Sequence, residues 1–132
     1  MIGVDTNVLL RLVVIENDEQ NAKVHSFFAE RNADDPAYVS AIVLAETIWL
    51  LRSRFGYSRS AVADMLRAML SSDDFLVEHE GRLASLLEQN PAPPAEIADF
   101  LIAWSAGSAG CTHTVTFDRR AASRIPGMEL LS

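Results

Sequence analysis

The chain opens with the stretch that decides its fold, Met1-Ile2-Gly3-Val4-Asp5-Thr6-Asn7-Val8-Leu9-Leu10. Ile2 and Val4 predict a short buried strand, and Thr6 or Asn7 is suited to cap a helix that starts near Val8. Asp5 therefore stands where the strand ends and the helix begins. In an α/β sheet, the carboxyl ends of the strands border the crevice in which ligands bind. The stretch predicts an α/β fold with Asp5 directed into a site, and the simpler alternative is that Asp5 is only an acidic helix cap.

Predicted strands and helices alternate along the rest of the chain. Short β-branched or aromatic runs predict further strands at residues 37–40, 75–77, 114–117 and 128–131. Apolar residues at helical spacing predict helices at residues 8–14, 19–31, 41–54, 58–70, 83–87, 95–109 and 119–124. Strands that alternate with helices form parallel sheets covered on both faces. We therefore expect a three-layer α/β/α sandwich with a short, mainly parallel central sheet.

Length and composition favour a single domain over residues 1–132. The chain has 132 residues, of which 49% are hydrophobic and 22% are charged, as in globular domains. The longest nearly apolar stretch, residues 41–51, is interrupted by Glu46 and is too short to span a bilayer. No secretory signal precedes the first strand, and the one cysteine, Cys111, cannot form an internal disulfide and is expected to be buried. These features predict a cytoplasmic protein without a membrane segment.

The chain is acidic, with a formal net charge of −7 at pH 7. Proteins that hold nucleic acid by a broad basic face have the opposite charge, so this kind of binding is disfavoured. Clustered carboxylates that bind divalent cations also contribute to the formal charge, and they are partly neutralised when the metal is bound. The charge therefore does not rule out a metal-dependent enzyme that acts on nucleic acid.

Two carboxylates interrupt otherwise apolar predicted helices. Glu46 is the one charged residue within residues 41–51, and Asp99 is the one charged residue within residues 97–110. The first helix is apolar almost all round, which predicts that it is buried, and Trp49 and Trp104 are expected in the core. A buried carboxylate must pair with a cation, hold a proton or bind a metal. Because the nearest basic residues to Glu46 are over a turn away, metal is the simpler partner.

A metal site would draw its ligands from two strands and two helices. Asp5 and Asp118 each follow a predicted strand, and Glu46 and Asp99 project from helices, so a parallel sheet could bring all four together at its carboxyl edge. Carboxylate oxygens suit Mg²⁺ or Mn²⁺, which keep water molecules for substrate phosphate oxygens. Glu96 precedes Asp99 by three positions on the same helical face and is a further candidate ligand.

The order and spacing of these motifs resemble those of the PIN-domain ribonucleases, in particular the VapC-type toxins of bacterial toxin–antitoxin pairs. The residues that carry the resemblance are Val4-Asp5-Thr6-Asn7-Val8-Leu9, Val43-Leu44-Ala45-Glu46, Glu96-Ile97-Ala98-Asp99-Phe100-Leu101-Ile102-Ala103 and Thr114-Val115-Thr116-Phe117-Asp118. By this resemblance, the acidic metal-binding positions are Asp5, Glu46, Asp99 and Asp118, and the polar residues that orient them are Asn7 and Thr116. Glu96 stands where members of the family often carry Asp.

The resemblance implies a divalent-metal-dependent endoribonuclease. One or two ions, Mg²⁺ or Mn²⁺, would activate water for in-line attack on a phosphodiester, leaving a 5′-phosphate and a 3′-hydroxyl. It also implies an antitoxin partner of the VapB type and a homodimer. Arginines close to the motifs are candidates to hold the RNA backbone, namely Arg11, Arg52, Arg54, Arg119 and Arg120.

Two other functions fit parts of the same pattern. Response-regulator receivers and aspartyl-phosphate phosphatases are also α/β proteins that use Mg²⁺, but they need a late lysine, and the one lysine here is Lys23. The phosphatase pattern also requires Asp at the position of Asn7. A module without turnover, in which the acids hold a structural ion or a basic peptide, is the second alternative. Metal-dependent RNA cleavage separates the nuclease from both.

Overall fold

The computed structural model describes residues 1–14 and 18–131 of the chain. Its strands are β1 (Ile2–Gly3), β2 (Ala37–Val39), β3 (Phe75–Val77), β4 (Thr114–Thr116) and β5 (Met128–Leu130). Its helices are α1 (Thr6–Val13), α2 (Asp18–Ala29), α3 (Ala41–Ser53), α4 (Arg59–Leu70), α5 (Glu80–Gln89), α6 (Ile97–Ser108) and α7 (Arg119–Arg124). Every strand and helix predicted from the sequence is present, with ends that differ by a few residues.

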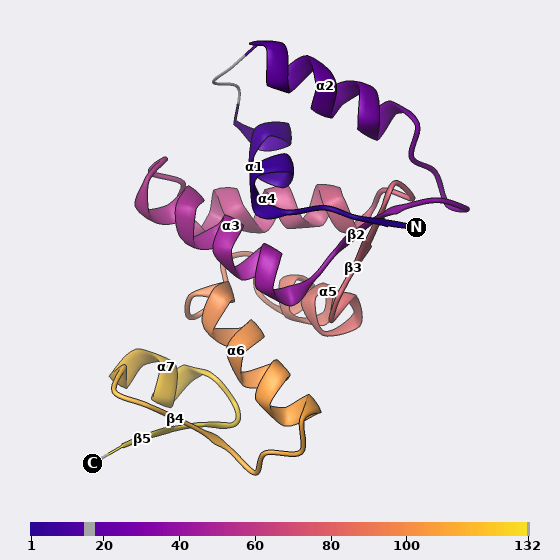
Figure 1. Ribbon diagram of the computed structural model, residues 1–132. Helices are drawn as coiled ribbons and strands as arrows, with labels where there is room; N and C mark the ends of the chain where they lie inside the picture. The colour runs from indigo at the N-terminus through magenta and orange to yellow at the C-terminus, as the bar shows by residue number, and fades with distance from the viewer. Residues whose placement is uncertain (15–17, 132) are drawn as a thin grey trace.

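The fold has the predicted α/β class, with helices packed on both sides of short parallel strands in a three-layer α/β/α arrangement (Figure 1). Strands β1, β2 and β3 form one parallel sheet in that order. Each crossover between these strands contains helices, as parallel pairing requires. In the part of the chain that the structure describes, no helix combines the length and the hydropathy needed to cross a bilayer.

The parallel strands are divided between two sheets, because β4 and β5 pair with each other and not with β1, β2 or β3. Figure 1 shows this pair, with α7, next to α6 and away from β1. A small apolar cluster fixes it there, in which Phe100 of α6 packs with Ala121, Ile125 and Met128. Strands of two or three residues form few ladder hydrogen bonds, so apolar packing decides where the second sheet lies.

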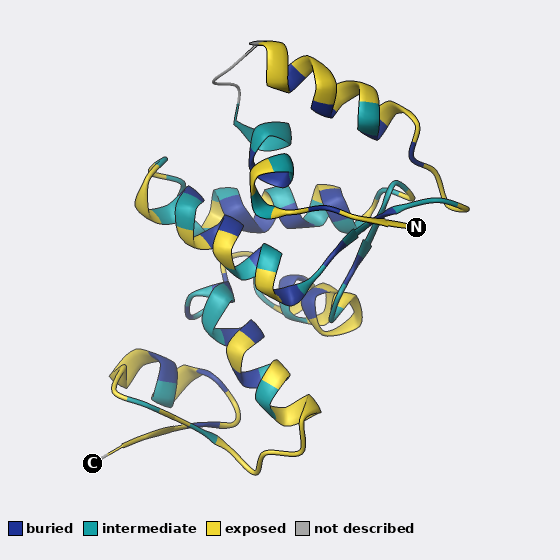
Figure 2. Cartoon of the chain, viewed as in Figure 1, coloured by how far each residue is buried: buried dark blue, intermediate teal, exposed yellow. Residues whose placement is uncertain are grey.

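The main core lies between the three-stranded sheet and the helices α1, α2, α3, α4, α5 and α6. Its largest fully buried side chains include Leu9, Leu44, Leu66, Leu83 and Leu101. Figure 2 shows the buried positions on the inner faces of these helices, while the outer face of α2 is exposed. This core fixes α1, α3 and α6, the helices that carry or follow three of the four candidate acids.

The interpretation of α3 as a helix buried all round is wrong. Leu44, Ile48 and Leu51 point into the core, but Ile42 is 83% exposed and Trp49 is 63% exposed. The reason is geometric, since α1, α4 and α6 cover the inner side of α3 and no described element covers its outer side. Trp104 of α6 agrees better with its predicted place, because it is half-buried against both apolar clusters.

Helix starts follow the expected side-chain chemistry at most positions. Ser40 caps α3 by accepting a hydrogen bond from Val43 N at 3.2 Å, and Ser58 caps α4 in the same way. The cap of α1 is Asp5, not Thr6 or Asn7. Outside these helix starts, Cys111 is exposed and not buried as predicted, because it lies in the loop after α6.

The amino terminus is held by a small ion-pair group centred on Asp35. The N-terminal ammonium group donates to Asp35 Oδ1 at 2.7 Å, and Arg31 Nη1 donates to Asp35 Oδ2 at 2.7 Å. The hydrogen bond from the ammonium group is the largest cause that lowers the pKa of Asp35, and burial opposes it. A lowered carboxyl pKa stabilises the fold above the unfolded pKa, and this stability is lost as pH falls through the folded value.

We therefore predict that Asp35→Asn destabilises the protein at neutral pH and that the difference from wild type shrinks in acid. Urea unfolding of both proteins at about pH 7 and at about pH 2.5, which is below the unfolded pKa of the carboxyl group, measures the two differences. A difference in free energy of unfolding that is the same at both pH values would show that the charge of Asp35 does not contribute.

Candidate active site

Asp5 is both the predicted site residue and a helix cap. Its Oδ1 accepts a hydrogen bond from Val8 N at 3.1 Å, at the N-terminus of α1. The side chain is exposed and borders two adjoining hollows between α1 and α2. Asn7, in the first turn of the helix, is also exposed and lines the first hollow. The cap and the site are therefore compatible, because the cap contact uses Oδ1 of the carboxylate.

Asp118 occupies the equivalent position at the end of β4. Its Oδ1 accepts hydrogen bonds from Arg120 N at 2.9 Å and from Ala121 N at 3.1 Å, which caps α7. Thr116 Oγ1 in turn accepts a hydrogen bond from Asp118 N at 3.0 Å. Thr116 thus fixes the backbone that carries Asp118, which agrees with the orienting position it was assigned by resemblance.

Asp99 lies in the first turn of α6 and is half-buried. Burial raises the pKa of its carboxyl group, and repulsion from Asp118 and then from Glu96 raises it further. Asp99 and Asp118 therefore lie within electrostatic reach of each other, although they come from a helix and from the loop after a strand. Among residues 1–14 and 18–131, neither carboxylate forms an ion pair with a Lys, Arg or His side chain.

Glu96 has a cation of its own, Arg52 of α3. Arg52 Nη2 donates to Glu96 Oε1 at 2.6 Å, and Arg52 Nε lies 3.1 Å from Oε2. Arg52 Nη1 also donates to the carbonyl oxygen of Tyr57 at 2.7 Å. The hydrogen bond with Glu96 raises the pKa of Arg52. Glu96, a candidate metal ligand, and Arg52, a candidate RNA contact, are thus bound to each other and join α3 to α6.

Glu46 is exposed on the outer side of α3, between Ile42 and Trp49 on the same helical face. The expectation that Glu46 is buried is therefore wrong, because no described element covers the outer side of α3. Its position in an apolar run reflects two exposed apolar neighbours, and not burial on all sides.

Of the four candidate acids, Asp99 and Asp118 lie within electrostatic reach of each other. The residues that the structure describes contain no group of three or more His, Cys, Asp or Glu side chains placed to hold one metal ion. Asp5 and Glu46 are not among the charges that shift the pKa of Asp99. Mg²⁺ is commonly held by one or two carboxylates, with water and substrate phosphate as its other ligands. The pair of Asp99 and Asp118 fits such an ion, because both residues offer carboxylate oxygens. In addition, no basic side chain in the described residues forms an ion pair with either of them.

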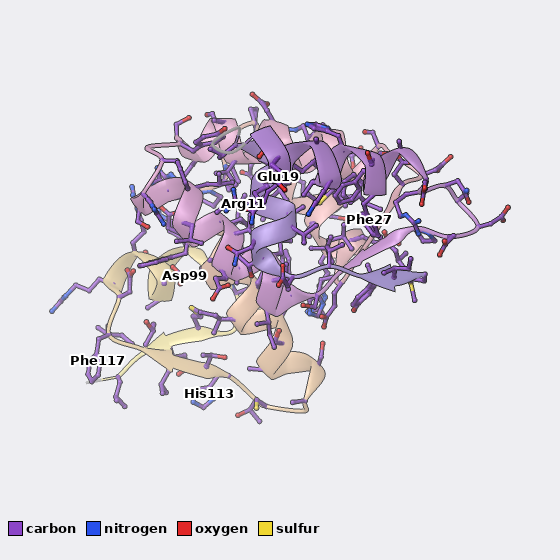
Figure 3. The ribbon with its side chains drawn as sticks, turned by 45° about the horizontal axis from the view of Figure 1, so that its top comes forward. Arg11, Glu19, Phe27, Asp99, His113 and Phe117 are labelled. Carbon is purple, nitrogen blue, oxygen red and sulfur yellow. The ribbon has the colours of Figure 1, made fainter. Side chains whose placement is uncertain are left out.

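The other candidate arginines have different surroundings. Arg119 and Arg120 are exposed on α7, directly after Asp118, and neither forms an ion pair within the described part of the chain. The guanidinium group of Arg54 lies over the ring of Phe55, with its carbon 5.6 Å from the ring centroid. Arg11 borders the hollow beside Asp5. Figure 3 shows Arg11 on the side of the molecule where α2 lies.

Sequence reasoning missed the ion pair between Arg52 and Glu96 and the role of Lys23 in lining the hollows beside Asp5. The first joins residues 44 positions apart, and the second depends on how α2 packs against α1. The signal that could have suggested the ion pair is the place of Arg52 at the end of an apolar helix.

Comparison with known proteins agrees with this arrangement. Searches of curated proteins and of solved structures find no match. A scan against protein families matches the PIN domain over residues 2–127. The match spans nearly the whole chain and includes all four candidate acids, and this protein therefore belongs to the PIN-domain family.

Proposed function

We propose that this protein is a divalent-metal-dependent endoribonuclease. PIN domains are typically metal-dependent nucleases. The observation that carries the proposal is the half-buried carboxylate of Asp99 within electrostatic reach of that of Asp118, with no basic side chain bound to either in residues 1–14 and 18–131. Two like charges at such a place raise the free energy of the fold unless one carboxylate holds a proton or a cation is bound by both.

In this proposal Asp99 and Asp118 hold Mg²⁺ or Mn²⁺, and Thr116 keeps Asp118 in place through the hydrogen bond to its backbone. A divalent ion at this position supplies Lewis-acid polarisation of a phosphodiester and lowers the pKa of bound water. Asp5 and Glu46 are further acids of the same site by resemblance to the family, and Asn7 is the polar residue beside Asp5. Arg52 forms an ion pair with Glu96, which lies three residues before Asp99. This ion pair partly neutralises the charge of Glu96 and so reduces its repulsion of Asp99.

The substrate in this proposal is RNA. Arg119 and Arg120 follow Asp118 directly and are exposed, so their guanidinium groups are available to contact backbone phosphates on either side of the cleaved bond. A role as the toxin of a toxin–antitoxin pair, with a VapB-type antitoxin, a homodimeric state and a cytoplasmic location, is supported by the resemblance of the motifs to VapC-type toxins.

We predict that cleavage of RNA by the purified protein requires Mg²⁺ or Mn²⁺ and yields 5′-phosphate ends. Sequencing of RNA ends after incubation with the metal, or with EDTA, measures both properties. Removal of the metal should abolish cleavage, since in this proposal the attacking water is activated by the metal. Cleavage that persists in EDTA, or 5′-hydroxyl products, would contradict the proposal. A rise in melting temperature with Mn²⁺ and no cleavage would indicate a metal-binding module instead.

A further inference from the structure

A groove runs between α1 and α2 and ends at Asp5. It consists of two adjoining hollows of about 300 and 460 Å³, which share Asp5, Val8, Lys23 and Val24 in their lining. One end of the groove is polar and includes Arg11, and the other end is apolar and includes Phe27. Figure 3 shows Arg11 and Phe27 at separate places along these two helices. The groove thus offers cations and an apolar floor next to one candidate catalytic acid.

The charge of this groove is opposite to that of the chain. Among the residues that the structure describes, the cations that line it are Arg11 and Lys23 and the one lining acid is Asp5, although the whole chain has a net charge of −7. The side chain of Arg11 forms no ion pair or hydrogen bond within residues 1–14 and 18–131. Lys23 is 77% exposed and lies 4.0 Å from Glu19, a contact too long and too exposed to neutralise it. Both cations are therefore available to an anionic ligand.

We propose that this groove binds a single-stranded segment of the RNA substrate, with Arg11 and Lys23 contacting backbone phosphates. This assignment rests on the proposed ribonuclease function and extends it to a binding surface outside the acid cluster. A polyanion is the ligand that two neighbouring cations favour, and the apolar floor of Val8, Val24 and Phe27 suits the ribose and base faces between phosphates. Because Asp5 lies at the junction of both hollows, a strand held in the groove passes directly beside that acid.

The test measures RNA affinity separately from cleavage. A short fluorescein-labelled oligouridylate is titrated with the full chain in EDTA at several salt concentrations, and anisotropy reports binding. Wild type is compared with Arg11→Gln, Lys23→Gln and the double variant. Arg82→Gln is the matched control, because Arg82 is an exposed arginine of α5 with the same charge and with no ion pair in the described residues. Urea unfolding of each variant confirms that the fold is retained.

We expect each groove substitution to weaken binding about 3- to 10-fold at low salt and to lower the slope of log affinity against log salt by about 0.7. Arg82→Gln should change neither. In the cleavage assay with Mn²⁺, the groove variants should raise KM and leave kcat unchanged, as expected for binding contacts that are equal in the ground state and the transition state. Groove variants that behave like Arg82→Gln in both assays would overturn the assignment.

The outcomes also separate this inference from the proposed function. If wild type cleaves RNA and the groove variants keep its KM and salt slope, the groove assignment fails and the nuclease stands. If wild type binds RNA through Arg11 and Lys23 but does not cleave it with any metal, the groove stands and the nuclease fails. Poly-glutamate is the second probe, and binding of poly-glutamate but not of RNA through these two residues would assign the groove to an acidic peptide and overturn the inference.

Discussion

An Asp99→Asn protein should cleave RNA more than about 100-fold more slowly than wild type, because it loses one of the two carboxylates proposed to hold the metal. Asparagine has nearly the same shape, so the helix start of α6 and the core should be preserved. Removing the charge also removes the repulsion from Asp118 and Glu96 that raises the pKa of Asp99. We therefore expect the metal-free variant to melt at the same temperature as wild type or higher.

Initial rates of cleavage of a labelled RNA in Mg²⁺, together with thermal melting in EDTA, measure both effects. Asp73→Asn is the matched control, because Asp73 is exposed in the turn before β3 and far in sequence from the acid pair. Its rate should equal that of wild type. An Asp99→Asn protein that keeps a rate within about tenfold of wild type would leave Asp99 without a role in the metal site.

A Leu44→Ala protein should lose about 2–5 kcal/mol of unfolding free energy. Leu44 is completely buried at the centre of the main core, on the side of α3 that faces its neighbouring helices. Truncation removes its apolar contacts and leaves a cavity that rigid neighbours fill only in part. Since domains of this size have about 5–15 kcal/mol of total stability, the loss is a large share of it.

Ile42→Ala, two residues away on the same helix, is the matched control for this prediction. Ile42 is 83% exposed, so its truncation should change the free energy of unfolding by no more than about 0.5 kcal/mol. Urea unfolding at neutral pH compares the two variants with wild type. Equal losses from both would mean that the outer face of α3 is covered in solution.

Local signals in the sequence predicted the order and type of every element in the described residues. Helix periodicity, cap residues and β-branched runs act over a few neighbouring positions, and this is why the helices that Ser40 and Ser58 cap begin within a residue of their predicted starts. The same locality explains why Asp5 and Asp118 were placed at the ends of strands. Each prediction depends on residues that remain neighbours in the fold.

Features that depend on which elements meet could not be read from the sequence. The apolar pattern of α3 does not show that one side of the helix is left uncovered by other elements. Trp49 and Glu46 were therefore expected to be buried, and both are exposed. In the same way, strand patterns do not tell that β4 pairs with β5 alone. The ion pair of Arg52 and Glu96 joins two helices distant in the sequence and required the fold to be seen.

The candidate site was predicted only in part, because the sequence does not show which elements meet. The sequence predicted Asp99 and Asp118 as acids of one site, and in the structure they lie within electrostatic reach of each other. It does not place Asp5 or Glu46 in a group with them in the described residues, so their membership of the site stays a prediction. The family match leaves the receiver and phosphatase alternative without support, since it assigns the whole pattern to the PIN domain.

Titration with Mn²⁺ tests whether the pair of Asp99 and Asp118 binds a metal. Calorimetry measures the heat of binding, and electron paramagnetic resonance measures the free ion. Wild type is predicted to bind Mn²⁺, Asp99→Asn and Asp118→Asn are each predicted to lose most of that affinity, and Asp73→Asn is predicted to keep it. Mn²⁺ binding that is absent from wild type, or equally strong in all four proteins, would contradict a metal centre at Asp99 and Asp118.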